Sequence, residues 1–79
     1  MEFKIIDNDK EIICNIVLTF NENGINYIIY QDGTKDENGE LVNYASRFNV
    51  VEGNYVLQPI EQNQEWELVE SKLNEKGAN

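Results

Sequence analysis

The chain has 79 residues, the length of one small domain with a thin hydrophobic core. It carries 15 acidic and 6 basic residues and no histidine, which gives a net charge of -9 at pH 7. Such a surface repels phosphate backbones and anionic lipids, so we expect no direct nucleic-acid partner and no membrane partner. The single cysteine excludes an intramolecular disulfide. No signal peptide and no apolar run of transmembrane length are visible, and we expect a cytoplasmic protein.

Two strands, predicted at residues 11–21 and 25–31, organise the rest of the sequence. They are joined at Asn23-Gly24, and both residues accept the positive φ that a type I′ turn requires. A two-residue loop fixes the register as Glu22 facing Ile25, Phe20 facing Tyr27, Leu18 facing Ile29, and Ile16 facing Gln31. Because side chains alternate between faces, one face is almost wholly apolar. Its members are Ile12, Cys14, Ile16, Leu18, Phe20, Tyr27 and Ile29.

The remaining strand patterns lie on either side of this hairpin. A first strand is expected at residues 2–6, and its turn places Phe3 and Ile5 on the same apolar face. Residues 32–40 contain no large apolar residue and are expected to form a loop. Two further strands are predicted at residues 41–49 and 54–58, the second of which ends before Pro59.

The apolar period changes from two to helical spacing near the C-terminus. Trp66, Val69 and Leu73 fall at i, i+3 and i+7 and predict a helix at residues 63–76, with Asn63 as its cap. A helix of this length is not stable alone, so its stripe must lie on the sheet, with Trp66 as the main contact. The predicted architecture is a single α+β domain over residues 1–79. It is a four- to five-stranded antiparallel meander with one C-terminal helix packed on the apolar face.

The C-terminal third of the sequence resembles a known family. The run Leu57-Gln-Pro-Ile-Glu-Gln-Asn-Gln-Glu-Trp-Glu-Leu-Val-Glu70 is similar to the closing signature of YrzB-like small acidic bacterial proteins. Tyr44-Ala-Ser-Arg-Phe48 is similar to a strand of the same family, and the resemblance covers most of the chain. Because the family is uncharacterised, the resemblance supplies no catalytic or binding residue. The resemblance also implies that the gene lies near one for a resolvase-like nuclease. A special case of an interaction role is therefore that the acidic protein mimics nucleic acid toward a DNA-processing enzyme.

No catalytic, cofactor or metal site emerges from the motifs. Asp36-Glu-Asn38-Gly39 is similar to part of a calcium loop, but Thr34 and Ala45 occupy the positions of the two end ligands, so we expect a solvated turn. Cys14 has no histidine to activate it and is expected to be a small core residue. We therefore expect no enzyme activity and no cofactor.

A candidate interaction surface lies on the wetter face of the predicted sheet. Tyr30 and Ile28, with Val17 and Ile13, form an apolar strip there, which is a candidate docking patch if neither the loop at residues 32–40 nor the helix covers it. Arg47 is expected to pair with a local carboxylate, and contact with a partner is the alternative. Trp66 is likewise a candidate partner anchor if it does not pack on the sheet.

Two functional hypotheses follow from the sequence. The first is a non-catalytic protein-interaction or regulatory module that binds a more basic protein, as a monomer or weak dimer. The alternative is a small-ligand-binding or catalytic domain that uses the loop at residues 32–40 as a lid.

Overall fold

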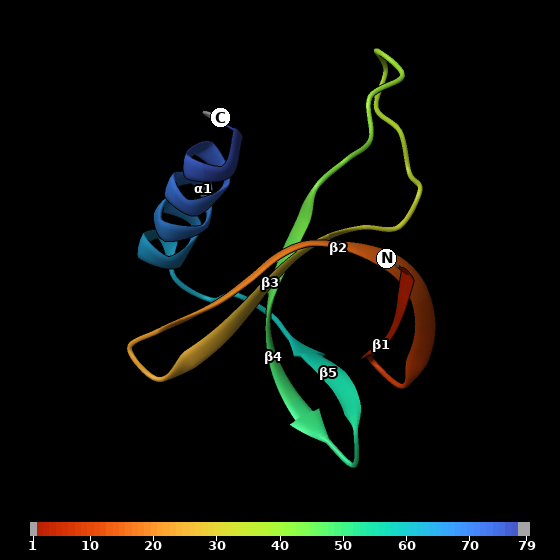
Figure 1. Cartoon of the computed structure of the whole chain (residues 1–79), viewed down its shortest axis with the longest axis vertical. Helices are drawn as coiled ribbons and strands as arrows, with labels where there is room; N and C mark the ends of the chain where they lie inside the picture. The colour runs from red at the N-terminus through yellow and green to blue at the C-terminus, as the bar shows by residue number, and fades with distance from the viewer. Residues whose placement is uncertain (1, 78–79) are drawn as a thin grey trace.

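A computed structural model describes residues 2–77 and shows five strands and one helix. In chain order these are β1 (Glu2–Asp7), β2 (Lys10–Glu22), β3 (Ile25–Gln31), β4 (Tyr44–Val51), β5 (Asn54–Gln58) and α1 (Asn63–Gly77). The strands follow one another around a closed barrel, and α1 lies to one side of it (Figure 1). The α+β class predicted from the sequence is confirmed. The sheet, however, closes on itself where the sequence pattern predicted an open meander.

Closure depends on β1, which pairs both with the next strand, β2, and with the last strand, β5. It runs antiparallel to β2 and parallel to β5, where Ile5 lies beside Tyr55 and Ile6 beside Val56. The other neighbours are antiparallel hairpins, as predicted. Joining the first strand to the last removes the exposed edges of an open sheet, where a partner strand would otherwise add.

A β-bulge in β2 changes which side chains share a face. The predicted register is correct from Glu22 back to Leu18, which faces Ile29, but Ile16 pairs with Tyr30 and not with Gln31. The ladder is irregular between Ile16 and Leu18, so Val17 is an extra residue in β2. An extra residue makes the side chains before and after it point to opposite faces, and it bends the strand. The single apolar face predicted for the hairpin is therefore divided in two.

The first half of that predicted face lines the barrel, and the second half lies outside it. The buried cluster inside the barrel consists of Ile5, Cys14, Ile28, Tyr30, Phe48 and Leu57, with Ile12 and Ile16 packed against it. On the outside, Phe20 stacks on Tyr27 with ring centroids 5.1 Å apart, next to α1. Because β3 has the barrel interior on one side and α1 on the other, Tyr27 to Tyr30 are all buried.

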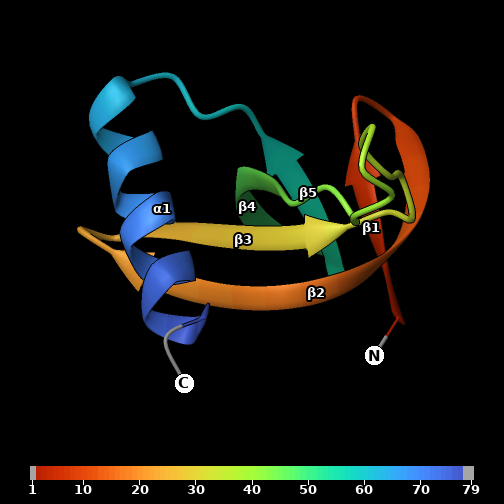
Figure 2. The ribbon, with the colours of Figure 1, turned by 90° about the horizontal axis from the view of Figure 1, so that it is seen from above.

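The helix α1 lies across β2 and β3 (Figure 2). It is rotated about its own axis relative to the orientation that the sequence predicted. Its buried positions are Glu65 and Val69, and the Lys72 ammonium lies 5.9 Å from the centre of the Phe20 ring. Trp66 is 44% exposed, so the prediction that it makes the main contact with the sheet is wrong. Successive helical residues are about 100° apart, and burying Glu65 in place of Trp66 turns the indole outward.

The connection between β3 and β4 projects away from the barrel (Figure 1). It is an ordered hairpin-like loop, with Lys35 bridged to Leu41 and the Asp36 carboxylate accepting backbone N–H groups of Asn38 and Glu40. The fourth strand begins at Tyr44, three residues later than the pattern predicted, because this loop continues past residue 40.

Candidate functional site

Three polar side chains meet where α1 docks on the barrel. Tyr27 on β3 and Arg47 on β4 are cross-strand neighbours on the outer face, and Glu65 reaches them from the first turn of α1. The Tyr27 hydroxyl donates to Glu65 Oε1 at 2.7 Å, and Arg47 Nε donates to the same oxygen at 2.7 Å. Arg47 Nη2 completes the ion pair at 2.5 Å. One carboxylate therefore ties two strands to the helix.

The second oxygen of Glu65 closes the start of the helix. Glu65 Oε2 accepts the backbone N–H groups of Glu61, at 3.2 Å, and Gln62, at 3.1 Å. A glutamate at the third helical position that reaches back to the residue before the helix forms half of a capping box. The sequence assigned the cap to Asn63, but Asn63 is the first helical residue and the capping carboxylate belongs to Glu65.

These contacts fix the ionisation of Glu65. Burial by itself raises the pKa of this carboxyl group, but the hydrogen bonds to its two oxygens outweigh burial and hold the pKa below the ordinary value of 4.5. Burial also raises the pKa of Tyr27, and the neighbouring Glu65 carboxylate adds to that effect. The glutamate is thus an anion with five donor groups around it at neutral pH, which suits a structural anchor better than an acid or base.

A cavity with a volume of about 530 Å³ lies at one mouth of the barrel. It is lined by Asp7, Asn8, Tyr30, Ala45, Ser46, Leu57 and Pro59. Asp7 comes two residues after the buried Ile5, so strand alternation puts it on the same face of β1, where it is exposed at the end of the strand. The Ser46 hydroxyl is 2.5 Å from the Gln58 carbonyl oxygen, to which it donates.

Tyr30 and Ser46 are the buried polar residues of the lining. Tyr30 is 8% exposed and stacks on Tyr44 with ring centroids 5.6 Å apart. Burial, followed by the charges of Asp7 and Asp32, raises the pKa of Tyr30 to about 12. The phenol is therefore a neutral hydroxyl group at physiological pH.

The interaction strip predicted from the sequence is not assembled on the surface. Val17 is half-buried at the bulge, Ile28 is fully buried, and Tyr30 belongs to the barrel interior, whereas Ile13 is exposed as predicted. The placement of Ile28 and Tyr30 on a wetter face is therefore wrong, because closure of the sheet turns their face of β3 into the barrel interior. Arg47 pairs with a local carboxylate as predicted, although the pair is largely buried and not exposed.

The other two candidate residues, Cys14 and Asp36, make contacts that belong to the fold. Cys14 is 2% exposed, as predicted, and burial followed by the charge of Asp32 raises the pKa of its thiol. The Asp36 carboxylate is engaged by its own loop. Within residues 2–77, no three His, Cys, Asp or Glu side chains gather in a way that could hold a metal ion.

Sequence reasoning missed both groupings just described. A glutamate in the first turn of the predicted helix was a usable signal for the capping carboxylate, although Gln62 is not one of the usual cap residues. No comparable local signal joins Glu65 to Tyr27, 38 residues away, or brings Asp7 near Tyr30.

Comparisons with known proteins place the chain in a family. A UPF0473 protein of Bacillus pumilus is 33% identical over 72 residues, which cover 86% of this chain and 76% of that protein. A UPF0473 protein of Bacillus velezensis is 32% identical over 72 residues, which cover 86% of this chain and 77% of that protein. No solved structure matches. The helix of the described segment is too short and polar to cross a membrane. The family model described as protein of unknown function (DUF1292) matches residues 7–76. In agreement with the resemblance to an uncharacterised bacterial family, the chain belongs to the DUF1292 family.

Proposed function

We propose that the protein is a non-catalytic cytoplasmic interaction module that binds a more basic protein through the outer face of α1. The observation that carries this proposal is the exposure of Trp66, which is 44% accessible on the first turns of α1. A large aromatic side chain held in solvent costs hydration free energy, and tryptophan is enriched among the residues that dominate binding energies.

The surroundings of Trp66 indicate what kind of partner it suits. Glu70 lies one helical turn further along the same face, and Glu67 is adjacent in sequence and exposed. An arginine or lysine of a partner can stack on the indole ring while it pairs with these carboxylates. We call the surface of Trp66, Glu67 and Glu70 the acidic indole face.

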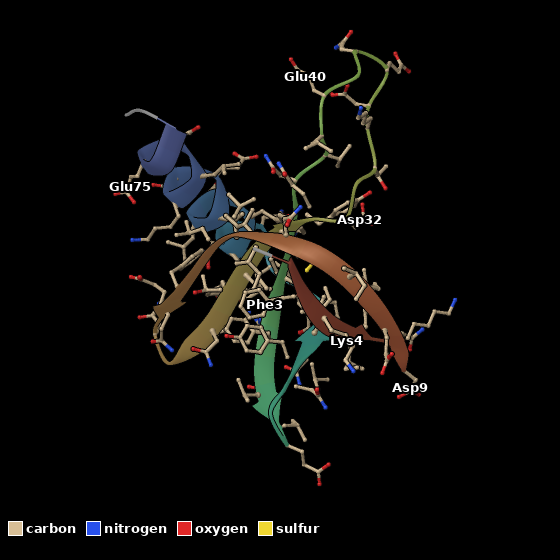
Figure 3. The ribbon with its side chains drawn as sticks, turned by 45° about the vertical axis from the view of Figure 1, so that its right-hand side comes forward. Phe3, Lys4, Asp9, Asp32, Glu40 and Glu75 are labelled. Carbon is tan, nitrogen blue, oxygen red and sulfur yellow. The ribbon has the colours of Figure 1, made fainter. Side chains whose placement is uncertain are left out.

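The charge distribution supports a basic partner. Three ion pairs among the described residues join Lys4 to Glu11, Arg47 to Glu65, and Lys72 to Glu75, so half of the basic residues are already neutralised within the molecule. Acidic side chains project from separate parts of the surface, among them Asp9, Asp32, Glu40 and Glu75 (Figure 3). A uniformly negative field increases the rate of encounter with basic proteins and weakens as salt is added.

Other exposed apolar residues make weaker candidates for the centre of an interface. Ile13, Leu41, Val50 and Val51 are each about half exposed, but they lie on β2, the loop and the end of β4. Isolated exposed aliphatic residues are normal on a small protein. Ile13 is therefore a suitable control position, with even greater exposure than Trp66.

Affinity capture from nuclease-treated lysate of the source organism tests the proposal, with wild-type, Trp66→Ala and Ile13→Ala proteins as bait. We expect one basic protein to be retained by wild type and by Ile13→Ala, lost with Trp66→Ala, and released as salt rises. Retention by Trp66→Ala equal to wild type would contradict a role for the acidic indole face. Circular dichroism of each variant verifies that the bait is folded.

A second function, binding of a small ligand, is favoured by the barrel-mouth cavity. A volume of about 530 Å³ falls in the range of small-molecule sites. The loop at residues 32–40 contributes no side chain to the lining, so the ligand-binding alternative is proposed without the lid that the sequence suggested.

A further inference from the structure

The barrel-mouth cavity combines one carboxylate with a buried phenol and an apolar wall. Asp7 and Asn8 come from the end of β1 and its turn, Tyr30 from the end of β3, and Leu57 from β5. Elements distant in sequence thus converge on a single concave space, which is the usual construction of a ligand site.

Asp7 supplies an exposed negative charge at the rim of the cavity. The ion pairs found within residues 2–77 use Glu11, Glu65 and Glu75, and Asp7 takes part in none of them. Burial raises the pKa of Tyr30 and the charge of Asp7 adds to that effect, so the two side chains that line the cavity lie near one another. A carboxylate at the rim of a cavity attracts a cation that enters it.

Tyr30 supplies a polar group that the fold does not use. Its side chain is more than nine-tenths buried and lines the cavity, yet no hydrogen bond to its hydroxyl is found among the described residues. No buried side-chain polar atom of the described residues lacks a hydrogen-bond partner, so this hydroxyl is reached by solvent from the cavity, where a ligand can bond to it. The ring of Tyr30 also presents an aromatic surface of the kind that attracts organic cations.

The remaining lining limits what the cavity can hold. Leu57, Pro59 and Ala45 form an apolar wall that suits a hydrocarbon stem. Anions are disfavoured by Asp7 and by the net charge of -9. A calcium ion requires six to eight oxygen ligands, and the lining offers a single carboxylate.

We propose that the barrel mouth binds a small organic cation, consisting of an ammonium group on a short aliphatic stem. The ammonium group pairs with Asp7 and bonds to the Tyr30 hydroxyl, and the stem lies on the wall formed by Leu57 and Pro59. This site is separate from the acidic indole face, so either proposal can fail without the other.

Titration of the protein with n-butylamine, followed by two-dimensional NMR, tests the inference. The alcohol n-butanol is the neutral control of equal length. We expect saturable shifts with the amine, confined to the cavity residues, and no saturable shifts with the alcohol. Equal shifts with both compounds, or no saturable binding of the amine, would overturn the proposal.

Matched variants separate a specific site from general attraction to an acidic protein. Asp7→Asn should weaken amine binding about tenfold, because it removes the facing charge without changing size. Asp9→Asn removes the same charge from the same turn but does not line the cavity, and affinity should stay within about twofold. Tyr30→Phe should weaken binding by about threefold to tenfold. Equal losses in Asp7→Asn and Asp9→Asn would show that the attraction is not specific to the cavity.

Discussion

The anchoring of α1 to the barrel can be tested by removing one oxygen atom. Tyr27→Phe deletes the hydroxyl that donates to the helix at 2.7 Å and leaves the ring in place. Tyr27 is 2% exposed, so phenylalanine fills the same space and no cavity forms. The stacking of this ring on Phe20 is also retained. The substitution therefore reports on the hydrogen bond and on little else.

The expected loss is large for so small a change. A hydrogen bond to a charged acceptor contributes about 1.5–3 kcal/mol, and we expect about 1.5 kcal/mol because Arg47 keeps the same oxygen bonded. A domain of this length has a free energy of unfolding of roughly 4–12 kcal/mol. Loss of about 1.5 kcal/mol corresponds to a fall in Tm of roughly 6–12 °C.

Urea denaturation followed by far-ultraviolet circular dichroism measures this loss. We expect the midpoint to fall while the slope m stays constant, because the surface exposed on unfolding is unchanged. Tyr44→Phe is the matched control, since Tyr44 is half-buried and stacks on Tyr30, and no hydrogen bond of its hydroxyl is found within the described residues. Its effect should stay below about 0.5 kcal/mol. An unchanged midpoint for Tyr27→Phe, or an equal loss in the control, would refute the anchoring role of this contact.

Three further predictions concern α1 and the core. Val69→Ala should lower the free energy of unfolding by about 2–3 kcal/mol, because Val69 is buried against the sheet. Trp66→Ala should lower it by only about 1 kcal/mol, because the larger indole is half-exposed. The reverse order in urea denaturation would contradict the orientation of the helix. Because the folded pKa of Glu65 lies below its ordinary value of 4.5, its contribution to stability is complete above that pH and is lost as pH falls through the folded pKa. Acid titration of wild type should thus show a loss of stability below pH 4.5 that is reduced in Glu65→Gln. Cys14 should react with a thiol reagent only as fast as the protein opens, and labelling at the rate of the unfolded chain would contradict its burial.

Local patterns in the sequence determined the elements and their order. Asn23 and Gly24 both have positive φ in the structure, 55° and 80°, as the type I′ turn required, and this turn set the register of the adjacent β2 and β3 residues. The change of apolar period located α1 at its observed start, Asn63. These features are readable because each depends on residues a few positions apart.

The bulge at Val17 was decided by the whole fold. Val17 is apolar and follows a regular alternation, so nothing in the sequence distinguishes an extra residue from an ordinary one. Bending of β2 there lets its first half line a barrel and its second half lie under α1, and both halves bury their apolar side chains. A regular strand would have kept them all on one face.

The orientation of α1 has the same kind of origin. Two overlapping stripes are available on the helix, one containing Trp66 and the other Glu65, and both include Val69. Apolar periodicity favours the first stripe, because it treats a glutamate as a surface residue. The stripe that contains Glu65 is buried because Tyr27 and Arg47 donate hydrogen bonds to its carboxylate. These two residues lie 38 and 18 positions before Glu65 in the sequence, on β3 and β4.

The sequence by itself therefore determined which segments are strands and helix, where the hairpin turns, and the acidic character of the surface. The tertiary structure alone decided that the sheet closes, which faces are interior, and which helical residues are buried. Local patterns measure the spacing of residues along the chain. These three outcomes depend on groups far apart in sequence whose charges and hydrogen bonds are satisfied only when the folded chain brings them together.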